Sequence, residues 1–297
     1  MKDGYIRVAS ASIDTLIGNV KHNANEIKKV LKETREKKAQ VIVFPELVLS
    51  GYTLEDLLLN ECLVQLEEIM HDTKGHQQIV VIGLPFHYQN NLYNVSAVLY
   101  DGNILGIVPK YHIPNYNEYY EGRRFTPCFE DNIEIELFGQ IVLFGRKVVF
   151  ACQNLPSFTL GVEICEDLWL PNAPSNELAL NGATVICNTS ASNELTAKKD
   201  YRRNLVSMQS AKLVSGYVYS NAGSGESTTD VVFSGHHLIC ENGTIINEST
   251  GFDAEVIYGD LDVEKLISER RKMTTYQSYH EYDYVYFDMD LIDIETN

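Results

Sequence analysis

Three side chains that could do chemistry each stand at the end of an apolar stretch with the length of a strand. Glu46 follows VIVF and a proline, Lys110 follows ILGIVP, and Cys165 ends FTLGVEIC. Loops at the carboxyl ends of strands carry functional residues in many α/β folds. A thiol needs a base or a cation to become a good nucleophile, and a Glu and a Lys from the first two segments would meet that need.

Each residue also has an ordinary structural interpretation. Glu46 could be a helix N-cap or a surface carboxylate, and Lys110 a solvated lysine at a strand end. Cys165 could be a small core hydrophobe, and the acidic residues around it should raise the pKa of its thiol. Against this, the loop after Lys110 is dense in Tyr, Asn and Glu, which is typical of a pocket for a polar ligand.

Taken together, the segments resemble the nitrilase superfamily, whose members place a catalytic Glu, Lys and Cys after three strands. FPELVLSGYTLEDL, KYHIPNYNEYYE, GVEICEDLW, NTSASN and GSGESTTD are similar, more narrowly, to the glutaminase domain of glutamine-dependent NAD synthetase. The similarity runs from the first strand to about Arg271, and EICEDLW and SASN are specific to that branch. It implies an α/β fold, the four-layer α-β-β-α sandwich of the nitrilase type.

The resemblance also implies roles for the three residues. The Cys165 thiol would attack the side-chain amide of glutamine and form a thioester, with Glu46 as the general base. Lys110 and the backbone N–H of Glu166 would stabilise the oxyanion, and Glu121 would hold the lysine. Ammonia released in this way would serve the ATP-dependent amidation of deamido-NAD to NAD.

Three further residues match positions that recognise glutamine in the family, namely Tyr116, Glu166 and Ser192. A carboxylate such as Glu166 suits the α-ammonium group of the substrate. Arg202 and the loop over residues 223–230 have family counterparts without an assigned role. His112 departs from the family pattern, which has a hydrophobic residue, Ser or Tyr at this position.

Composition restricts the remaining function classes. The chain has 297 residues, of which 44% are hydrophobic, and a net charge of −17. Such a surface repels nucleic acid and anionic membranes. The first residues lack the apolar stretch of a signal peptide, and no run reaches the roughly 18 apolar residues of a membrane span. The six cysteines form no C-x-x-C pair, so we expect free thiols, no metal site and a cytoplasmic location.

Hydrophobic periodicity predicts helices over residues 19–38, 54–70 and 196–214. Asp101-Gly102 and Asn242-Gly243 predict two hairpins, joining 92–100 to 104–108 and 231–240 to 244–247. The mixture favours a mixed sheet, or two sheets, covered by helices. We expect one domain over residues 1–271, followed by a tail or linker over 272–297. Further strands are expected over 5–10, 41–44, 79–84, 133–137, 141–144, 148–152, 158–165, 184–188 and 217–222.

Two other constellations are weaker. Gly223-Ser224-Gly225 could cradle a phosphate, but a lone G-x-G is usually a turn. His236 and His237 could suggest a metal, but neighbours on a strand face opposite sides and cannot chelate one ion together. We therefore expect structural roles for both motifs.

The sequence contains no Ser-Gly-Gly phosphate loop of the kind found in the family's ATP-dependent ligase domain. We therefore expect the amidase half of such an enzyme, with L-glutamine as substrate and a ligase domain, in the same or a separate chain, as partner. No cofactor is expected in this chain, because ATP and Mg would belong to the ligase domain. Family members assemble through this fold, so a homo-oligomer is expected.

Two alternatives remain open. The first is a free-standing amidase or carbamoylase of the nitrilase type that acts on another small amide. The second is a catalytically silent scaffold, which the joint presence of Glu46, Lys110 and Cys165 disfavours.

Overall fold

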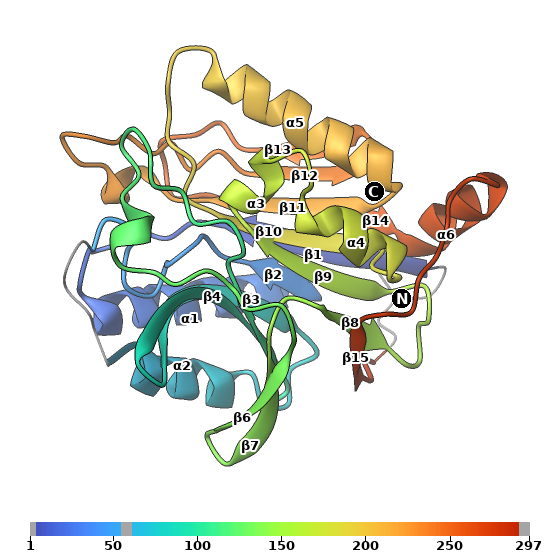
Figure 1. The fold of residues 1–297 in the computed structure, drawn as a ribbon, viewed down its shortest axis with the longest axis horizontal. Coiled ribbons are helices and arrows are strands. Elements are labelled where there is room, and N and C mark those ends of the chain that lie inside the picture. The colour runs from blue at the N-terminus through green and yellow to red at the C-terminus, as the bar shows by residue number, and fades with distance from the viewer. Residues whose placement is uncertain (1–3, 55–60, 291–297) are drawn as a thin grey trace.

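The chain folds into two mixed β-sheets that pack face to face, with helices on both outer faces (Figure 1). The computed structural model describes residues 4–54 and 61–290. The predicted α/β fold with α-β-β-α layers is therefore confirmed.

The first sheet has eight strands, and its central strands β1, β2 and β3 run parallel. Antiparallel pairing extends it on both sides, through β14 at one edge and through β4 and β5 towards the other. In spatial order the strands are β14 (Val256–Asp262), β1 (Tyr5–Ala11), β2 (Val41–Val43), β3 (Ile79–Tyr88), β4 (Asn91–Tyr100), β5 (Asn103–Pro109), β7 (Gln140–Phe144) and β6 (Ile133–Leu137).

The second sheet has seven strands, and its central strands β9, β10 and β11 are parallel. In spatial order they are β13 (Thr244–Glu248), β12 (Leu238–Glu241), β11 (Gly216–Asn221), β10 (Val185–Ser190), β9 (Thr159–Ile164), β8 (Val148–Cys152) and β15 (Asp283–Phe287).

Strand β2 shows why the central strands are apolar on both faces. Val41 and Val43 pack in the cluster between the two sheets, whereas Ile42 faces the cluster under the helices. Because side chains alternate along a strand, a strand covered on both sides needs an apolar residue at every position.

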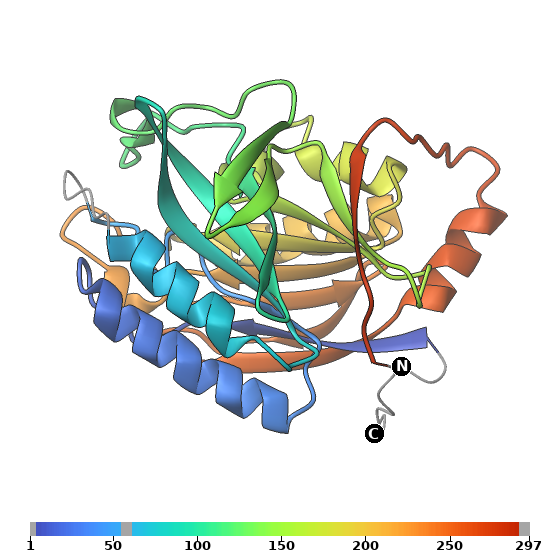
Figure 2. The same cartoon turned by 90° about the horizontal axis from the view of Figure 1, so that it is seen from below.

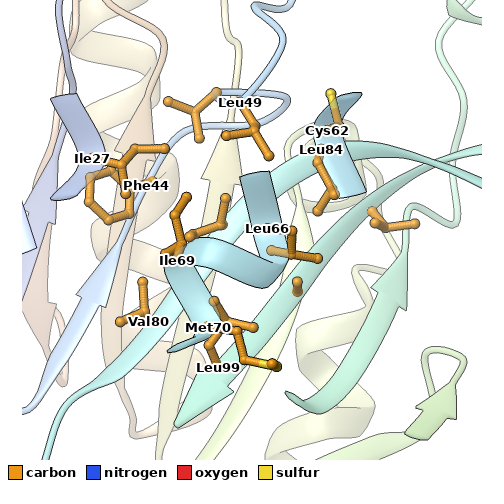
Figure 3. Packing of buried hydrophobic residues seen from close by; sticks show 14 of the residues in the cluster. Ile27, Phe44, Leu49, Cys62, Leu66, Ile69, Met70, Val80, Leu84 and Leu99 are labelled. Atoms are coloured by element: carbon orange, nitrogen blue, oxygen red, sulfur yellow. The ribbon is translucent and has the colours of Figure 1, made fainter. Parts of the chain in front are cut away.

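Helices α1 (Val20–Glu36) and α2 (Glu61–Asp72) cover the outer face of the first sheet. Figure 3 shows their inward residues, such as Ile27 and Leu66, packed against Phe44 and Leu84 of the sheet side. Asn19 caps α1 by accepting a hydrogen bond from His22 N at 3.1 Å. The helix predicted over 54–70 is thus observed from Glu61, and its first residues, 55–60, lie outside the described residues.

The opposite outer layer consists of α4 (Pro174–Leu180) and α5 (Lys198–Leu213), with the short α3 (Glu166–Trp169) beside them. Helix α6 (Val263–Lys272) follows β14 directly. Within the described residues, two single 3-10 turns lie in loops: η2 (Glu121–Arg123) between β5 and β6, and η3 (Ser224–Glu226) between β11 and β12.

Both predicted hairpin turns are confirmed, with positive φ at Asp101, Gly102, Asn242 and Gly243. The strand predicted over 231–240 is wrong in its first part, since β12 begins only at residue 238. Gly235 explains the break, because its φ of +62° lies in the left-handed region and interrupts an extended strand.

The segment after α6 contributes to the second sheet. No secondary structure was predicted there, yet β15 pairs in parallel with β8 from Asp283↔Val148 to Phe287↔Cys152. Figure 2 shows this red segment running back from α6 to the sheet edge. Strand β14 and helix α6 were also not predicted from the sequence.

Candidate active site

The candidate residues lie in loops that follow parallel strands or a hairpin strand of the two facing sheets. Glu46 follows β2 and Lys110 follows β5 in the first sheet, whereas Cys165 follows β9 and Ser192 follows β10 in the second. A direct bond joins the two sides, since Ala191 N donates to Glu46 Oε2 at 2.9 Å.

Lys110 forms the centre of a buried ion cluster. Its Nζ donates to Glu46 Oε1 at 2.6 Å and to Glu121 Oε1 at 2.6 Å. Glu46 and Lys110 are 0% exposed and Glu121 is 5% exposed. Burial by itself lowers the pKa of Lys110, but the carboxylates of Glu121 and Glu46 outweigh it and raise that pKa well above its usual value. Lys110 is therefore charged at neutral pH.

Two residues that sequence reasoning missed complete this cluster. Asn94 Nδ2 donates to Glu46 Oε1 at 2.6 Å and to Glu121 Oε2 at 3.2 Å, so one amide links both carboxylates. Tyr52 donates its hydroxyl to Glu121 Oε1 at 2.7 Å. Asn94 is itself buried on β4, and a polar residue inside such a strand is the signal that could have identified it.

Glu46 has the properties of a proton acceptor. Burial raises its pKa to about 7, with Lys110 opposing the shift and Glu121 adding to it. Gly83 of β3 lies directly behind the Glu46 turn, and a Cβ there would approach Leu47 N to 2.4 Å and Pro45 O to 2.5 Å. The glycine therefore lets the turn sit against the sheet.

Cys165 stands at a sharp bend between β9 and α3. Its φ of +45° and ψ of −99° are unusual for a residue with a side chain, and its backbone N–H donates to Thr189 O at 3.0 Å. Burial and the carboxylate of Glu46 raise the pKa of its thiol, while Lys110 lowers it. The thiol is thus protonated at rest and depends on a base when it reacts.

The expected rise in the Cys165 pKa has a different main origin from the one predicted. Neighbours in sequence were expected to cause it, but burial and Glu46 are the largest causes. The carboxylate of Glu163 instead binds Tyr217 and Ser175 N, and that of Asp167 binds the loop after Lys110.

A small pocket of about 110 Å³ opens beside Cys165. Tyr116 donates its hydroxyl to Glu166 Oε1 at 2.7 Å on its wall, and Ser192 also lines it. Lys198, which sequence reasoning missed, contributes a cation on the same wall. Its Nζ donates to Asn193 Oδ1 and lies 4.9 Å from the centre of the Trp169 ring. The pocket therefore offers two carboxylates, Glu118 and Glu166, and the ammonium group of Lys198 near the thiol, and Glu118 already accepts from Asn193 Nδ2.

Arg202 supports the pocket through the loop after β10. Its guanidinium is 0% exposed and donates to Ser192 Oγ at 3.3 Å, Asn193 O at 2.8 Å and Glu194 Oε2 at 3.1 Å. These contacts hold the loop that carries Ala191 and Ser192 in place.

The weaker motifs have structural partners. His236 Nε2 contacts Glu248, whereas His237 contacts Ser10 and Ser12, so the two imidazoles face different groups. Among residues 4–54 and 61–290, no cluster of His, Cys, Asp or Glu is arranged to hold a metal ion. Within the same ranges, no helix is both long and apolar enough to cross a membrane. The six cysteines are free and buried.

The layered fold and a buried Glu–Lys pair beside a strand-end cysteine define the class as a hydrolase of the nitrilase type. Residues 7–271 match the carbon-nitrogen hydrolase family, and the chain belongs to that family. The catalytic roles of its individual residues stay predictions.

Comparison with known proteins shows which members of the family the chain resembles. The chain is 39% identical over 280 residues to a glutamine-dependent NAD(+) synthetase of Mycobacterium tuberculosis, which covers 92% of this chain and 41% of the relative. A glutamine-dependent NAD(+) synthetase structure from Cytophaga hutchinsonii superimposes with a TM-score of 0.77 at 24% identity, covering 86% and 43%. A carbon-nitrogen hydrolase structure from Helicobacter pylori gives 0.71 at 18% identity, covering 92% and 94%. The chain thus spans about two fifths of the length of the NAD(+) synthetases it matches.

Proposed function

We propose that this chain hydrolyses the side-chain amide of L-glutamine to glutamate and ammonia. The observation that carries the proposal is the arrangement around Cys165. A buried Glu46–Lys110–Glu121 cluster lies on one side, and a pocket wall that carries the Glu166 carboxylate and the Lys198 ammonium group lies on the other. The first can activate a thiol, and the second is complementary to an amino acid.

In the first half-reaction, Cys165 Sγ forms a bond to the amide carbon while Glu46 takes the thiol proton. Glu46 then passes this proton to the amide nitrogen, the carbon–nitrogen bond breaks, and ammonia leaves a thioester behind. A pKa of about 7 suits a group that must both accept and release a proton near neutral pH.

The negative charge on the carbonyl oxygen needs donors. An ammonium group has three N–H groups, and Glu46 and Glu121 accept two of those on Lys110. The third can point to the substrate oxygen. The backbone N–H of Glu166, at the first position of α3, supplies a second donor, since first-turn N–H groups of a helix have no partner within it.

In the second half-reaction, water attacks the thioester carbon. Glu46 takes a proton from the water, the carbon–sulfur bond breaks, and the proton returns to Cys165 Sγ. Glutamate leaves and the enzyme regains its starting state.

Recognition of the amino acid uses the pocket wall. Glu166, oriented by the Tyr116 hydroxyl, would bind the α-ammonium group. Lys198 is half-buried beside Trp169 and would bind the α-carboxylate. Ser192 lines the same pocket and would complete the contacts with glutamine.

We further infer that the ammonia serves a ligase that amidates deamido-NAD at the cost of ATP. The support is the similarity to glutamine-dependent NAD(+) synthetases, which are more than twice as long as the matched region. ATP and Mg would bind to that ligase, which can lie in the same or a separate chain.

The test is to incubate the purified chain with L-glutamine and, separately, with a simple aliphatic amide, and to measure ammonia and acid. We expect ammonia and glutamate in equal amounts, with strong preference for glutamine. Equal rates on both amides would instead favour the alternative of a free-standing amidase that acts on other small amides.

A second assay tests the partner. The chain with ATP, deamido-NAD and ammonium should form no NAD, whereas adding an ammonia-dependent NAD synthetase should let glutamine serve as the nitrogen source. Formation of NAD by residues 1–297 alone would contradict the proposal that the ligase site lies outside these residues.

A further inference from the structure

We propose that Asp167 is a positioning residue that fixes Lys110 relative to Cys165, and that His112 supports it. The inference rests on the proposed amidase function, but one of its tests is independent of any substrate. Asp167 is 2% exposed and lies two residues after the nucleophile, on α3.

The Asp167 carboxylate accepts hydrogen bonds from two separate segments. Oδ2 accepts from Ile164 N at 3.2 Å, and Ile164 is the last residue of β9, next to Cys165. The same oxygen accepts from Tyr111 N at 3.4 Å. Oδ1 accepts from His112 N at 2.8 Å and contacts His112 Nδ1 at 2.9 Å. One side chain thus joins the cysteine bend to the two residues that follow Lys110.

The rest of the Lys110 backbone is held from the other side. Its N–H donates to Asn94 O at 2.8 Å on β4, and its carbonyl accepts from Cys128 N at 3.0 Å. These contacts tie the Lys110 backbone to β4 and to the loop before β6. Asp167 connects it to the loop that presents the thiol from the second sheet, so the distance between thiol and ammonium depends on this carboxylate.

The chemistry of the two side chains fits this role. A carboxylate only accepts, and four N–H groups surround this one, so an asparagine at this position would turn its NH₂ group towards at least one backbone N–H. Because a carboxylate cannot donate, a hydrogen bond across the 2.9 Å contact with Asp167 Oδ1 requires a proton on His112 Nδ1. This contact with Asp167 explains why position 112 holds a residue with a side-chain N–H, although the family pattern has other residues there.

The loop that starts at Tyr111 also carries Tyr116 and Glu118 into the pocket. Displacing its beginning affects chemistry more than binding, because Tyr119 and Glu118 remain anchored to Asn193 at the far end. The expected signature is a loss in kcat with a smaller change in KM, and the same loss on glutamine and on a simple amide.

The first experiment compares Asp167→Asn with the wild-type chain and with Glu241→Gln. Glu241 is also a buried carboxylate that accepts from a backbone N–H, at 2.8 Å from Asp262 N, but it lies on β12 and contacts none of the site residues. For each protein, the rate of Cys165 alkylation by iodoacetamide is followed by peptide mass spectrometry, together with kcat, KM and the thermal midpoint.

For Asp167→Asn we expect alkylation and kcat to fall by about 10²-fold, because a misplacement of about 1 Å at a reacting centre has effects of that size. Glu241→Gln should lose thermal stability only. Asp167→Asn with alkylation and kcat within about twofold of wild type, and only a lower thermal midpoint, would overturn the proposal. If the wild type hydrolyses no glutamine, the proposed function fails, and the alkylation rates still decide the role of Asp167.

The partly exposed His112 provides a second pair of variants should Asp167→Asn not fold. His112→Asn retains a side-chain N–H that can reach Asp167, whereas His112→Phe does not. We expect His112→Phe to lose about tenfold or more in alkylation rate and kcat, roughly the value of one hydrogen bond to a charged group, and His112→Asn to retain most of both. Equal behaviour of the two variants would contradict the proposal.

Discussion

The two walls of the site satisfy their charges in opposite ways. On the inner wall, Glu46 and Glu121 are paired with the ammonium group of Lys110. On the outer wall, the contacts of Glu166 and Lys198 are with neutral groups, a tyrosine hydroxyl for the first and an amide and an indole ring for the second.

In the proposed function, this difference separates catalysis from recognition. The inner wall is organised before any substrate arrives, which is what electrostatic stabilisation of a transition state requires. The outer wall keeps the charges of Glu166 and Lys198 available, and a zwitterionic ligand would neutralise both. Substitutions on the inner wall should therefore affect every amide, and substitutions on the outer wall only amino-acid amides.

The largest effect is expected at the residue between the walls. Cys165→Ala should lower ammonia release from every amide by about 10⁴-fold or more, since no other group can form the thioester. Cys187→Ala is the matched control, because Cys187 is buried inside β10 and should alter only the free energy of unfolding, by about 0.5–3 kcal/mol. Substantial turnover by Cys165→Ala would remove it as the nucleophile.

Lys110→Met should break the inner wall in two ways. The rate on all amides should fall by about 10²–10³-fold through loss of an oxyanion donor. The free energy of unfolding should fall by about 3–5 kcal/mol, because two buried carboxylates lose their partner. Lys265→Met, which removes an exposed lysine paired with Glu241 at 2.9 Å, should change stability by only about 0–1 kcal/mol. Kinetics and chemical denaturation of both variants measure this contrast, and equal stability losses would argue against it.

Glu166→Gln tests the negative charge of the outer wall. Its kcat/KM for glutamine should fall by the equivalent of about 2–5 kcal/mol, because a charge-assisted contact with the α-ammonium group is lost. The same variant should process a simple aliphatic amide at nearly the wild-type rate. An equal loss on both substrates would assign Glu166 to support of the thiol instead of recognition.

Lys198→Met tests the positive charge. We expect KM for glutamine to rise by about tenfold with kcat retained, since the contact is made equally in the ground and transition states. Lys199→Met is the control, because the neighbouring Lys199 Nζ donates to Thr250 O at 3.3 Å, outside the pocket. A rise in KM for both variants would indicate a general effect of charge.

The smallest effect is a pH dependence that sharpens the role of Glu46. Glu46 must be ionised to take the thiol proton, and burial raises its pKa to about 7, so kcat/KM should rise with pH through about 7. Burial also raises the pKa of Glu163 to about 7, but Glu163 binds Tyr217 and Ser175 away from the thiol. Glu163→Gln should therefore leave the midpoint of the pH–rate profile in place.

The same control has a defined effect on stability. The pKa of Glu163 in the folded state lies above its ordinary value of 4.5, so the folded state binds this proton more tightly than the unfolded state. The resulting stability is complete below about pH 4.5 and is lost as pH rises through about 7. Urea denaturation from pH 4.5 to 8 should show a weaker pH dependence in Glu163→Gln than in wild type.

Much of the fold follows from local sequence because its central strands are buried on both faces. Runs such as VIVF and IVVIGLPF have few polar residues and admit few alternatives. Strand β14 was missed because VIYGDLD includes a glycine and two aspartates, residue types that are rare in strands. Gly259 is required there, since a Cβ would approach Ile239 Cγ2 to 2.8 Å where the two sheets meet.

The reactive side chains were accessible from sequence because each ends a strand within a recognisable motif. Apart from Glu121, which was expected to hold Lys110, their partners were not, because they come from distant segments. Tyr52 reaches Glu121 across 69 residues of sequence, and Asp167 reaches His112 across 55. Lys198 begins a helix whose sequence gives no sign that its first residue faces a pocket. Such contacts depend on how the two sheets face each other, which no local pattern records.

The backbone at Cys165 has a consequence for how such proteins change over time. A non-glycine residue with φ of +45° and ψ of −99° costs about 1–3 kcal/mol, which the surrounding structure must offset. Under the proposed mechanism, the need for a nucleophile would keep cysteine there despite that cost. In a lineage freed from catalysis, glycine at this position would be tolerated and would make the fold more heat-resistant. Thermostability screens on this scaffold should therefore enrich inactive variants at the nucleophile, so they need a counter-selection for activity.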